Sequence, residues 1–100
     1  MPSIGLATDG VSRTINGMTY VYLIESVHYQ GHHYVGITDN LKQRFTDHNE
    51  GRSVHTRKFL PWNLVTYSAF ADVHVAAAFE KYLKTGSGKA FMKRHYFRPS

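Results

Sequence analysis

Four side chains that can move a proton or neutralise a phosphate lie at spacings that predict one small surface. Tyr22 and Tyr34 fall in two consecutive strand-like runs, and Arg44 and His48 follow at a helical interval of four residues. A guanidinium is planar and permanently charged, so it suits a phosphate oxygen, and an imidazole exchanges a proton near neutral pH. With a carboxylate nearby to hold a metal, this set predicts phosphodiester chemistry.

Each of these residues also has a purely structural interpretation. Tyr20, Tyr22 and Tyr34 would pack as aromatic neighbours across a hairpin, and a basic pair four residues apart is typical of a solvated helix surface. Against that, the run containing Tyr34 leads almost directly into the predicted helix, which keeps it close to Arg44 and His48. The spacing alone leaves both interpretations open.

Glu80 is the only acid between Asp72 and the C-terminus, and it lies in an otherwise apolar helical run, four residues after Ala76 and three before Leu83. It could be an exposed partner of Lys84. The alternative is a carboxylate that reaches into the basic site and holds a hard divalent cation. Mg²⁺ typically takes one or two carboxylates and leaves the rest to water and phosphate.

The elements that must position these groups follow from local patterning. Residues 18–25 and 33–37 are dense in β-branched and aromatic residues, which predicts two strands of a hairpin closed by a turn at 28–32. Residues 63–70 predict a third strand, reached through a basic loop at 52–61.

Three helices are expected. Thr38 or Asp39 should cap the first, and Gly51 should end it. A second helix is predicted from Asp72, its cap, through Lys84. Its apolar stripe comprises Val75, Ala76, Phe79 and Leu83. Gly86 and Gly88 are expected to interrupt the helix, and a short basic helix is expected over 89–96.

The order ββαβαα predicts an α/β sandwich of the α+β type, with a small sheet covered by helices. One hundred residues make one domain: a loose arm at 1–17, the domain at 18–96 and a tail at 97–100. Cysteine is absent, which excludes disulfides, thiolate nucleophiles and zinc fingers. No apolar run approaches the ~20 residues of a membrane helix, so we predict a soluble, cytoplasmic protein with no membrane partner.

The charge balance favours a polyanionic partner. Twelve Lys and Arg against seven Asp and Glu give a net charge of +5. Trp62, Phe91 and Tyr96 lie near the basic segments and could stack on bases. The residues expected to bind nucleic acid are Arg52, His55, Arg57, Lys58, Lys89, Lys93 and Arg94.

These motifs together resemble the GIY-YIG nuclease superfamily, specifically its small stand-alone bacterial proteins, which are similar to the N-terminal domain of the excinuclease C protein. The resemblance spans about residues 18–95. The matching segments are Tyr20-Val21-Tyr22, Tyr34-Val35-Gly36, the helix signature at 38–49, the strand entry at 61–65 and the acidic helix with its glycines at 80–91.

The resemblance implies a three-stranded, mainly antiparallel sheet flanked by helices, and cleavage of DNA that depends on a divalent metal, Mg²⁺ or Mn²⁺. By position, Tyr22 would help to activate the attacking water, with Tyr34 supporting it. Arg44 would contact the scissile phosphate. His48 would transfer a proton or position the nucleophile, and Glu80 would be the metal ligand.

Two departures from the family pattern are visible. Tyr20 replaces the first glycine of the family name and could narrow the site, and no Asn occurs between Phe91 and His95. A non-catalytic nucleic-acid-binding module on the same fold is the first alternative, and a protein-interaction domain is the second. We expect weak or structure-dependent specificity on structured or single-stranded DNA, with dimerisation or a partner protein supplying the rest. The pathway, DNA repair or another, stays open.

Overall fold

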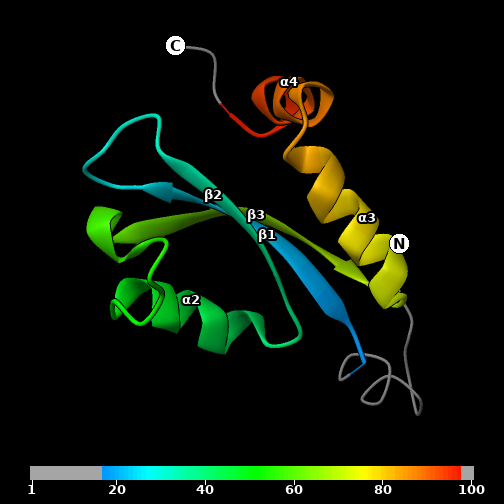
Figure 1. Cartoon of the computed structure of the whole chain (residues 1–100), viewed down its shortest axis with the longest axis horizontal. Coiled ribbons are helices and arrows are strands. Elements are labelled where there is room, and N and C mark those ends of the chain that lie inside the picture. Colours follow the sequence, from blue (N-terminus) through cyan, green and yellow to red (C-terminus); the bar gives the residue numbers. More distant parts are fainter. Residues whose placement is uncertain (1–16, 98–100) are drawn as a thin grey trace.

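The computed structural model describes residues 17–97 and confirms the predicted order ββαβαα (Figure 1). The predicted arm at 1–17 and tail at 97–100 lie almost wholly outside the described residues. The elements are β1 (Thr19–Ser26), β2 (His33–Thr38), α2 (Leu41–Asn49), the short 3-10 helix η1 (Arg57–Phe59), β3 (Trp62–Phe70), α3 (Val73–Leu83) and α4 (Gly86–His95).

The three strands form one antiparallel sheet in the order β2-β1-β3, as predicted. Tyr22 in the central strand pairs with Gly36 on β2 and with Tyr67 on β3. The register shifts between Leu23 and Ile24 on the β3 side, which marks a β-bulge. Because β1 has a neighbour on both edges, its position in the sheet is fixed from two sides.

Helices cover both faces of the sheet, with α2 on one side and α3 and α4 on the other (Figure 1). Side chains alternate along a strand, so the odd residues Val21 and Leu23 pack in the α3–α4 layer and the even residues Tyr22 and Ile24 face α2. All four are at most 2% exposed. The buried partners are Ala76, Leu83 and Met92 on the first side and Trp62 on the second.

The start of α2 corrects the predicted cap. Asn40 caps the helix, because its side chain accepts a hydrogen bond from the Gln43 amide at 3.2 Å. The predicted cap Thr38 instead accepts from the Asn40 amide at 3.1 Å, and Asp39 makes no cap. Gly51 has φ +77° just beyond the helix, which confirms it as the stop.

The α3–α4 region confirms one prediction and corrects two. Asp72 caps α3, accepting from the His74 amide at 2.8 Å. Val75, placed in the apolar stripe, is 50% exposed, since it lies on the outer side of the helix. Gly86 and Gly88 are not the residues that separate the two helices, because α3 ends at Leu83 and α4 already begins at Gly86. They form the first turn of α4, capped by Thr85, whose hydroxyl accepts from the Gly88 amide at 3.1 Å.

The region 52–61, predicted as a basic loop, contains η1 and is otherwise irregular. Within residues 17–97 the structure has no helix with the length and apolar character needed to cross a bilayer.

Candidate active site

The phenol of Tyr22 is one end of a buried hydrogen-bonded chain. Its oxygen lies 2.7 Å from Nε2 of His48, which α2 brings under the sheet. Nδ1 of His48 lies 2.6 Å from the hydroxyl of Thr56, in the segment before η1. Tyr22 is 2% exposed, and His48 and Thr56 are both 0% exposed. Residues of β1, of α2 and of the segment before η1 therefore form one hydrogen-bonded line through the α2 layer.

Gly36 makes room for this phenol. It pairs with Tyr22 across β1 and β2, and a Cβ atom at position 36 would overlap the hydroxyl and ring of Tyr22. Glycine is thus needed here for a close approach rather than for backbone freedom. This is a physical reason for the glycine of the second sequence motif.

Tyr34 and Arg44 complete the predicted set. The Tyr34 ring centroid lies 6.4 Å from that of Tyr22 and 5.2 Å from that of His48. Arg44 projects from α2 to the same phenol and shares its helix face with His48. The sequence placed these four side chains on one surface, and the structure brings them together.

The environment fixes the protonation states at neutral pH. Burial raises the pKa of Tyr22 to about 12, although the adjacent Arg44 guanidinium opposes this shift. Burial, together with the smaller effect of the Arg44 charge, lowers the pKa of His48 to about 4. Interaction with the Tyr22 oxygen raises the pKa of Arg44 in turn. At pH 7 the site therefore holds a protonated phenol, a neutral imidazole and a permanent cation.

Glu80 approaches from the other layer. It belongs to α3, on the opposite face of the sheet from α2, yet its charge still contributes to raising the pKa of Tyr22. Its carboxylate accepts a hydrogen bond from Nζ of Lys84 at 2.8 Å, which confirms the ion pair considered from sequence. No group of three His, Cys, Asp or Glu side chains able to hold a metal occurs within residues 17–97. A single carboxylate fits Mg²⁺, which needs only one or two.

The predicted nucleic-acid contacts differ in how free their charges are. Arg52 is already engaged, with Asp47 at 3.0 Å and Glu50 at 2.6 Å. His55, Arg57 and Lys58 are exposed in the irregular segment. A groove beside β2 and α4 contains Tyr34 and carries four cations against one acid, Glu25. Those cations are Lys84, Lys89, Lys93 and Arg94.

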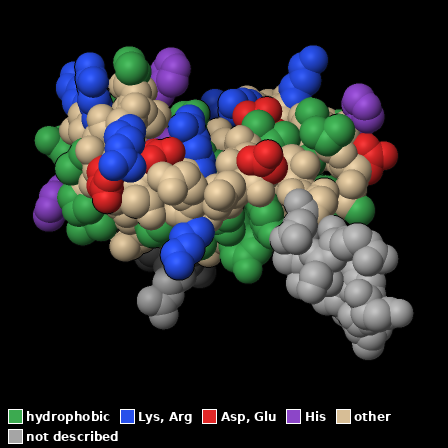
Figure 2. Space-filling view, turned by 90° about the horizontal axis from the view of Figure 1, so that it is seen from below, with side chains coloured by type: hydrophobic (Ala, Val, Ile, Leu, Met, Phe, Trp, Pro, Cys, Tyr) green, Lys and Arg blue, Asp and Glu red, His purple; other side chains and the backbone are tan. Residues whose placement is uncertain are grey.

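The face of the molecule seen from below Figure 1 carries mixed charge, because its Lys and Arg side chains are interspersed with acidic ones (Figure 2). Trp62 is not accessible for stacking on bases, because it is 4% exposed and its indole N–H donates to the Thr56 carbonyl at 3.0 Å. Its predicted role in stacking is therefore wrong.

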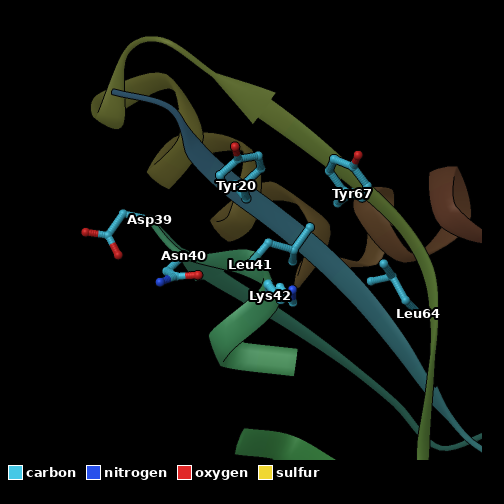
Figure 3. Close-up of a pocket in the computed structure, with 7 residues that line it drawn as sticks. All are labelled: Tyr20, Asp39, Asn40, Leu41, Lys42, Leu64 and Tyr67. Atoms are coloured by element: carbon cyan, nitrogen blue, oxygen red, sulfur yellow. The ribbon is translucent and has the colours of Figure 1, made fainter. Parts of the chain in front are cut away.

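Tyr20, the residue in place of the family glycine, lines a separate hollow at the start of α2 (Figure 3). Its ring packs edge-to-face on Tyr67 of β3, with centroids 5.9 Å apart. The phenol of Tyr22 instead lies over Gly36 of β2. In the sheet order β2-β1-β3, β2 and β3 flank opposite edges of the central strand. The bulk of Tyr20 is thus directed away from that phenol.

Thr56 is the member of the site that sequence reasoning missed. It stands in an irregular segment with no periodicity, so no spacing rule connects it to His48. The only signal in the sequence was a small hydroxyl residue embedded among basic residues, which is unremarkable in a loop.

Comparison with known proteins gives two matches. A family model described as the GIY-YIG catalytic domain matches residues 18–95. The chain is also similar to a protein of Lacticaseibacillus paracasei named UPF0213 protein, with 40% identity over 55 residues. That match covers 54% of this chain and 62% of the relative, so it spans less than two thirds of the relative's length. No solved structure matches the chain.

Proposed function

Because the chain belongs to the GIY-YIG catalytic domain family, a family of nucleases, we propose that it is an endonuclease that hydrolyses DNA phosphodiester bonds with the help of a divalent metal. The catalytic domain would be residues 18–96. The observation that carries the proposal is the Tyr22–His48 hydrogen bond, closed off from solvent and flanked by Arg44. Arg44 favours the phenolate of Tyr22, and that phenolate is the form that can accept a proton from water.

Each residue has a role that its chemistry supports. Tyr22 would accept the proton of the attacking water once its phenolate forms, and Arg44 favours that anion through its charge. Arg44 would also neutralise a non-bridging phosphate oxygen, and Tyr34 would help to orient the water. Glu80 would hold Mg²⁺ or Mn²⁺, which when bound supplies positive charge for the phosphate. Lys84 would release Glu80 for that purpose.

Substrate contact is proposed along the groove beside α4, with Lys89, Lys93 and Arg94 binding the backbone. The exposed basic residues His55, Arg57 and Lys58 would add contacts, and Arg52 less because of its ion pairs. Such contacts track phosphates and read little sequence. We therefore propose weak or structure-dependent choice of DNA, sharpened by a second copy or a partner protein.

A plasmid-nicking assay tests the proposal. We expect the wild type to convert supercoiled DNA to open circles in Mg²⁺ or Mn²⁺, and EDTA to abolish the reaction. Tyr22→Phe and Glu80→Gln should each lower the rate by roughly 10²–10⁴-fold, the range typical of a lost general base or charge stabiliser. Tyr67→Phe is the matched control, because it removes an exposed phenol on β3 and should retain the rate.

Two outcomes would overturn these assignments. Wild-type rates in Tyr22→Phe or Glu80→Gln would remove that residue's role. A wild type that binds DNA but does not nick it with any divalent metal would leave the non-catalytic nucleic-acid-binding module as the function.

A further inference from the structure

Three aromatic rings meet where the turn of the β1–β2 hairpin contacts η1, at one end of the sheet (Figure 1). We call Tyr29, His32 and Phe59 the tip cluster. The His32 ring stacks on Phe59, with centroids 4.3 Å apart and ring planes inclined by 20°. Tyr29 stands nearly perpendicular to both rings, 5.1 Å from Phe59 and 6.0 Å from His32.

The turn is fixed by hydrogen bonds that do not involve these rings. The hydroxyl of Ser26 donates to the Phe59 carbonyl at 2.7 Å and accepts from the Tyr29 amide at 3.1 Å. The Val27 amide donates to the Pro61 carbonyl at 3.0 Å. The tip cluster is therefore held in place before any ligand arrives, which lowers the entropic cost of binding one.

The rings of the tip cluster are open to solvent. Tyr29 is 48% exposed, His32 is exposed and Phe59 is half-buried. His32 uses one ring face on Phe59, so its exposure leaves the other face open. A flat, open aromatic face suits a second flat ring, and every nucleobase has such a face. Trp62, the ring expected from sequence, is buried and cannot serve in this way.

The charge around the tip cluster favours an anionic ligand. Residues 26–38 and 51–71 supply the cluster and its surroundings, and they contain no Asp or Glu. His55, Arg57 and Lys58 are exposed in the second segment, and Nζ of Lys58 lies 6.0 Å from the centroid of the Phe59 ring. Rings bordered by cations fit a base together with its phosphate, whereas an apolar protein segment would match the rings alone.

The tip cluster lies beside the candidate active site. His32 immediately precedes β2 and still pairs with β1, because its carbonyl accepts from the Ser26 amide at 2.9 Å. Side chains two residues apart on a strand share a face at a spacing of about 7 Å, so His32 continues the face of Tyr34. Tyr34 and Phe59 also pack against the same buried group, which contains Tyr22.

The groove beside β2 and α4 reaches the same turn. It is lined by Gln30, Gly31 and His33, the neighbours of His32, and by Tyr34. A strand whose phosphates follow the cations of this groove therefore passes the turn and comes within reach of the tip cluster. This continuity identifies a nucleotide of the bound strand as the ligand.

We propose that the tip cluster is a base-stacking subsite, in which an unpaired nucleobase of the bound DNA stacks on the open face of His32 beside Tyr29. This inference rests on the proposed function for the identity of the ligand, but stacking does not depend on cleavage. A base within a duplex is covered by its neighbours and is not available to His32. The subsite therefore selects DNA that is unpaired next to the site of cleavage.

DNA binding in EDTA, where no cleavage is expected, tests the proposal. Fluorescence anisotropy of labelled oligothymidylate and of a blunt duplex, over a range of salt concentrations, gives affinities and salt slopes. We expect His32→Ala to weaken oligothymidylate binding roughly 5- to 150-fold, the usual effect of losing one stacked base. The salt slope should not change, because no phosphate contact is lost. Duplex affinity should equal that of the wild type.

Two further variants serve as controls. His32→Phe keeps a flat ring and should bind oligothymidylate within about threefold of the wild type. His74→Ala removes an exposed histidine from α3 and should keep the wild-type affinities and slopes. A 2-aminopurine base placed in the oligonucleotide should lose fluorescence on binding to the wild type, since stacking quenches it, and this measurement needs no variant.

Several results would overturn the subsite: wild-type affinity in His32→Ala, an equal loss on duplex DNA, a lower salt slope, or His32→Phe binding as weakly as His32→Ala. A wild type that does not bind oligothymidylate would also overturn it. If His32→Ala does not fold, unquenched 2-aminopurine in the wild-type complex decides against stacking. The expected binding pattern in a protein that nicks no DNA with any divalent metal would refute the nuclease proposal alone.

Discussion

The phenol of Tyr22 is harder to ionise than a tyrosine in water, and this limits any reaction that uses it as a base. Burial raises its pKa to about 12, so at pH 7 only a minute fraction is phenolate. Below the pKa that fraction grows tenfold with each pH unit. We therefore expect kcat/KM for DNA cleavage to rise about tenfold per unit between pH 7 and 9, until the effective pKa in the substrate complex is reached.

Hydroxide also increases with pH, so the profile needs a control at the same residue. Fluorination of a phenol lowers its pKa, and 3-fluorotyrosine at position 22 should therefore shift the profile to lower pH and raise the rate at pH 7. The same replacement at Tyr67 should leave the profile unchanged. Equal profiles for unmodified and fluorinated Tyr22 would contradict a role for this phenol as base.

His48 predicts a pH dependence of folding stability. Its pKa is about 4 in the folded protein against 6.5 for an unperturbed histidine. Between these values the unfolded chain binds a proton that the folded protein does not, so the free energy of unfolding falls as the pH falls from 6.5 to 4. The expected loss is on the order of 2–3 kcal/mol. Urea unfolding across this range would measure it.

Two variants isolate this contribution. His48→Gln should be less stable at pH 7 but lose less further stability on acidification than the wild type. His74→Gln, at an exposed position on α3, should follow the wild-type curve. If His48→Gln retained the full acid sensitivity, other groups would be responsible.

At the scale of elements, the features that follow from local sequence patterns were predicted correctly. The β-branched and aromatic runs located all three strands, and Asp72 and Gly51 marked helix ends correctly. The errors concern the cap of α2 and the glycines of α4, whose roles do not follow from such patterns. Asn40, not Thr38 or Asp39, caps α2, because its side chain accepts a hydrogen bond from the Gln43 amide. Several neighbouring polar residues could equally have made such a contact.

The glycines of α4 were misjudged for a physical reason. Glycine usually weakens a helix, but Gly88 lies where α4 begins against the end of α3, and a Cβ there would overlap the Tyr82 carbonyl and the Leu83 backbone. Close packing between two helices therefore requires it. Sequence alone does not show that contact, because it depends on the angle at which the chain leaves α3.

This contact predicts opposite effects at two neighbouring glycines. Gly88→Ala should lower the free energy of unfolding by about 1–3 kcal/mol, the usual cost of overpacking, because backbone must move. Gly86→Ala meets nothing within 4 Å and should leave stability unchanged or raise it by up to about 1 kcal/mol. Thermal unfolding of both variants would measure the difference, and equal losses would contradict the packing argument.

At the scale of the whole molecule, the site depends on contacts across three layers. Tyr22, Tyr34, Arg44 and His48 could be placed together from sequence because a hairpin leads directly into α2. Thr56 could not, because its contact with His48 arises from an irregular segment folded under the sheet. The position of Glu80 relative to the phenol was equally inaccessible, since it depends on how α3 packs against the opposite face.

The distribution of charge over the molecule predicts which cations bind DNA. Lys93 lines the groove beside α4, whereas Arg52 is held by two carboxylates, at 3.0 Å and 2.6 Å. Each phosphate contact contributes about 0.7–0.9 to the slope of log K against log salt concentration. In a Tyr22→Phe background, which prevents cleavage, Lys93→Ala should therefore reduce that slope by nearly one unit.

Arg52→Ala is the matched control for the same measurement. Removing Arg52 also frees two acids, but before removal its charge was largely committed within the protein, so the slope should change by less than half as much. Fluorescence anisotropy of labelled single-stranded and duplex DNA from 50 to 300 mM salt would give both slopes. Equal changes for the two variants would mean that Arg52 contacts phosphate as Lys93 does, despite its ion pairs. A slope unaffected by Lys93→Ala would exclude the α4 groove as the path of the strand.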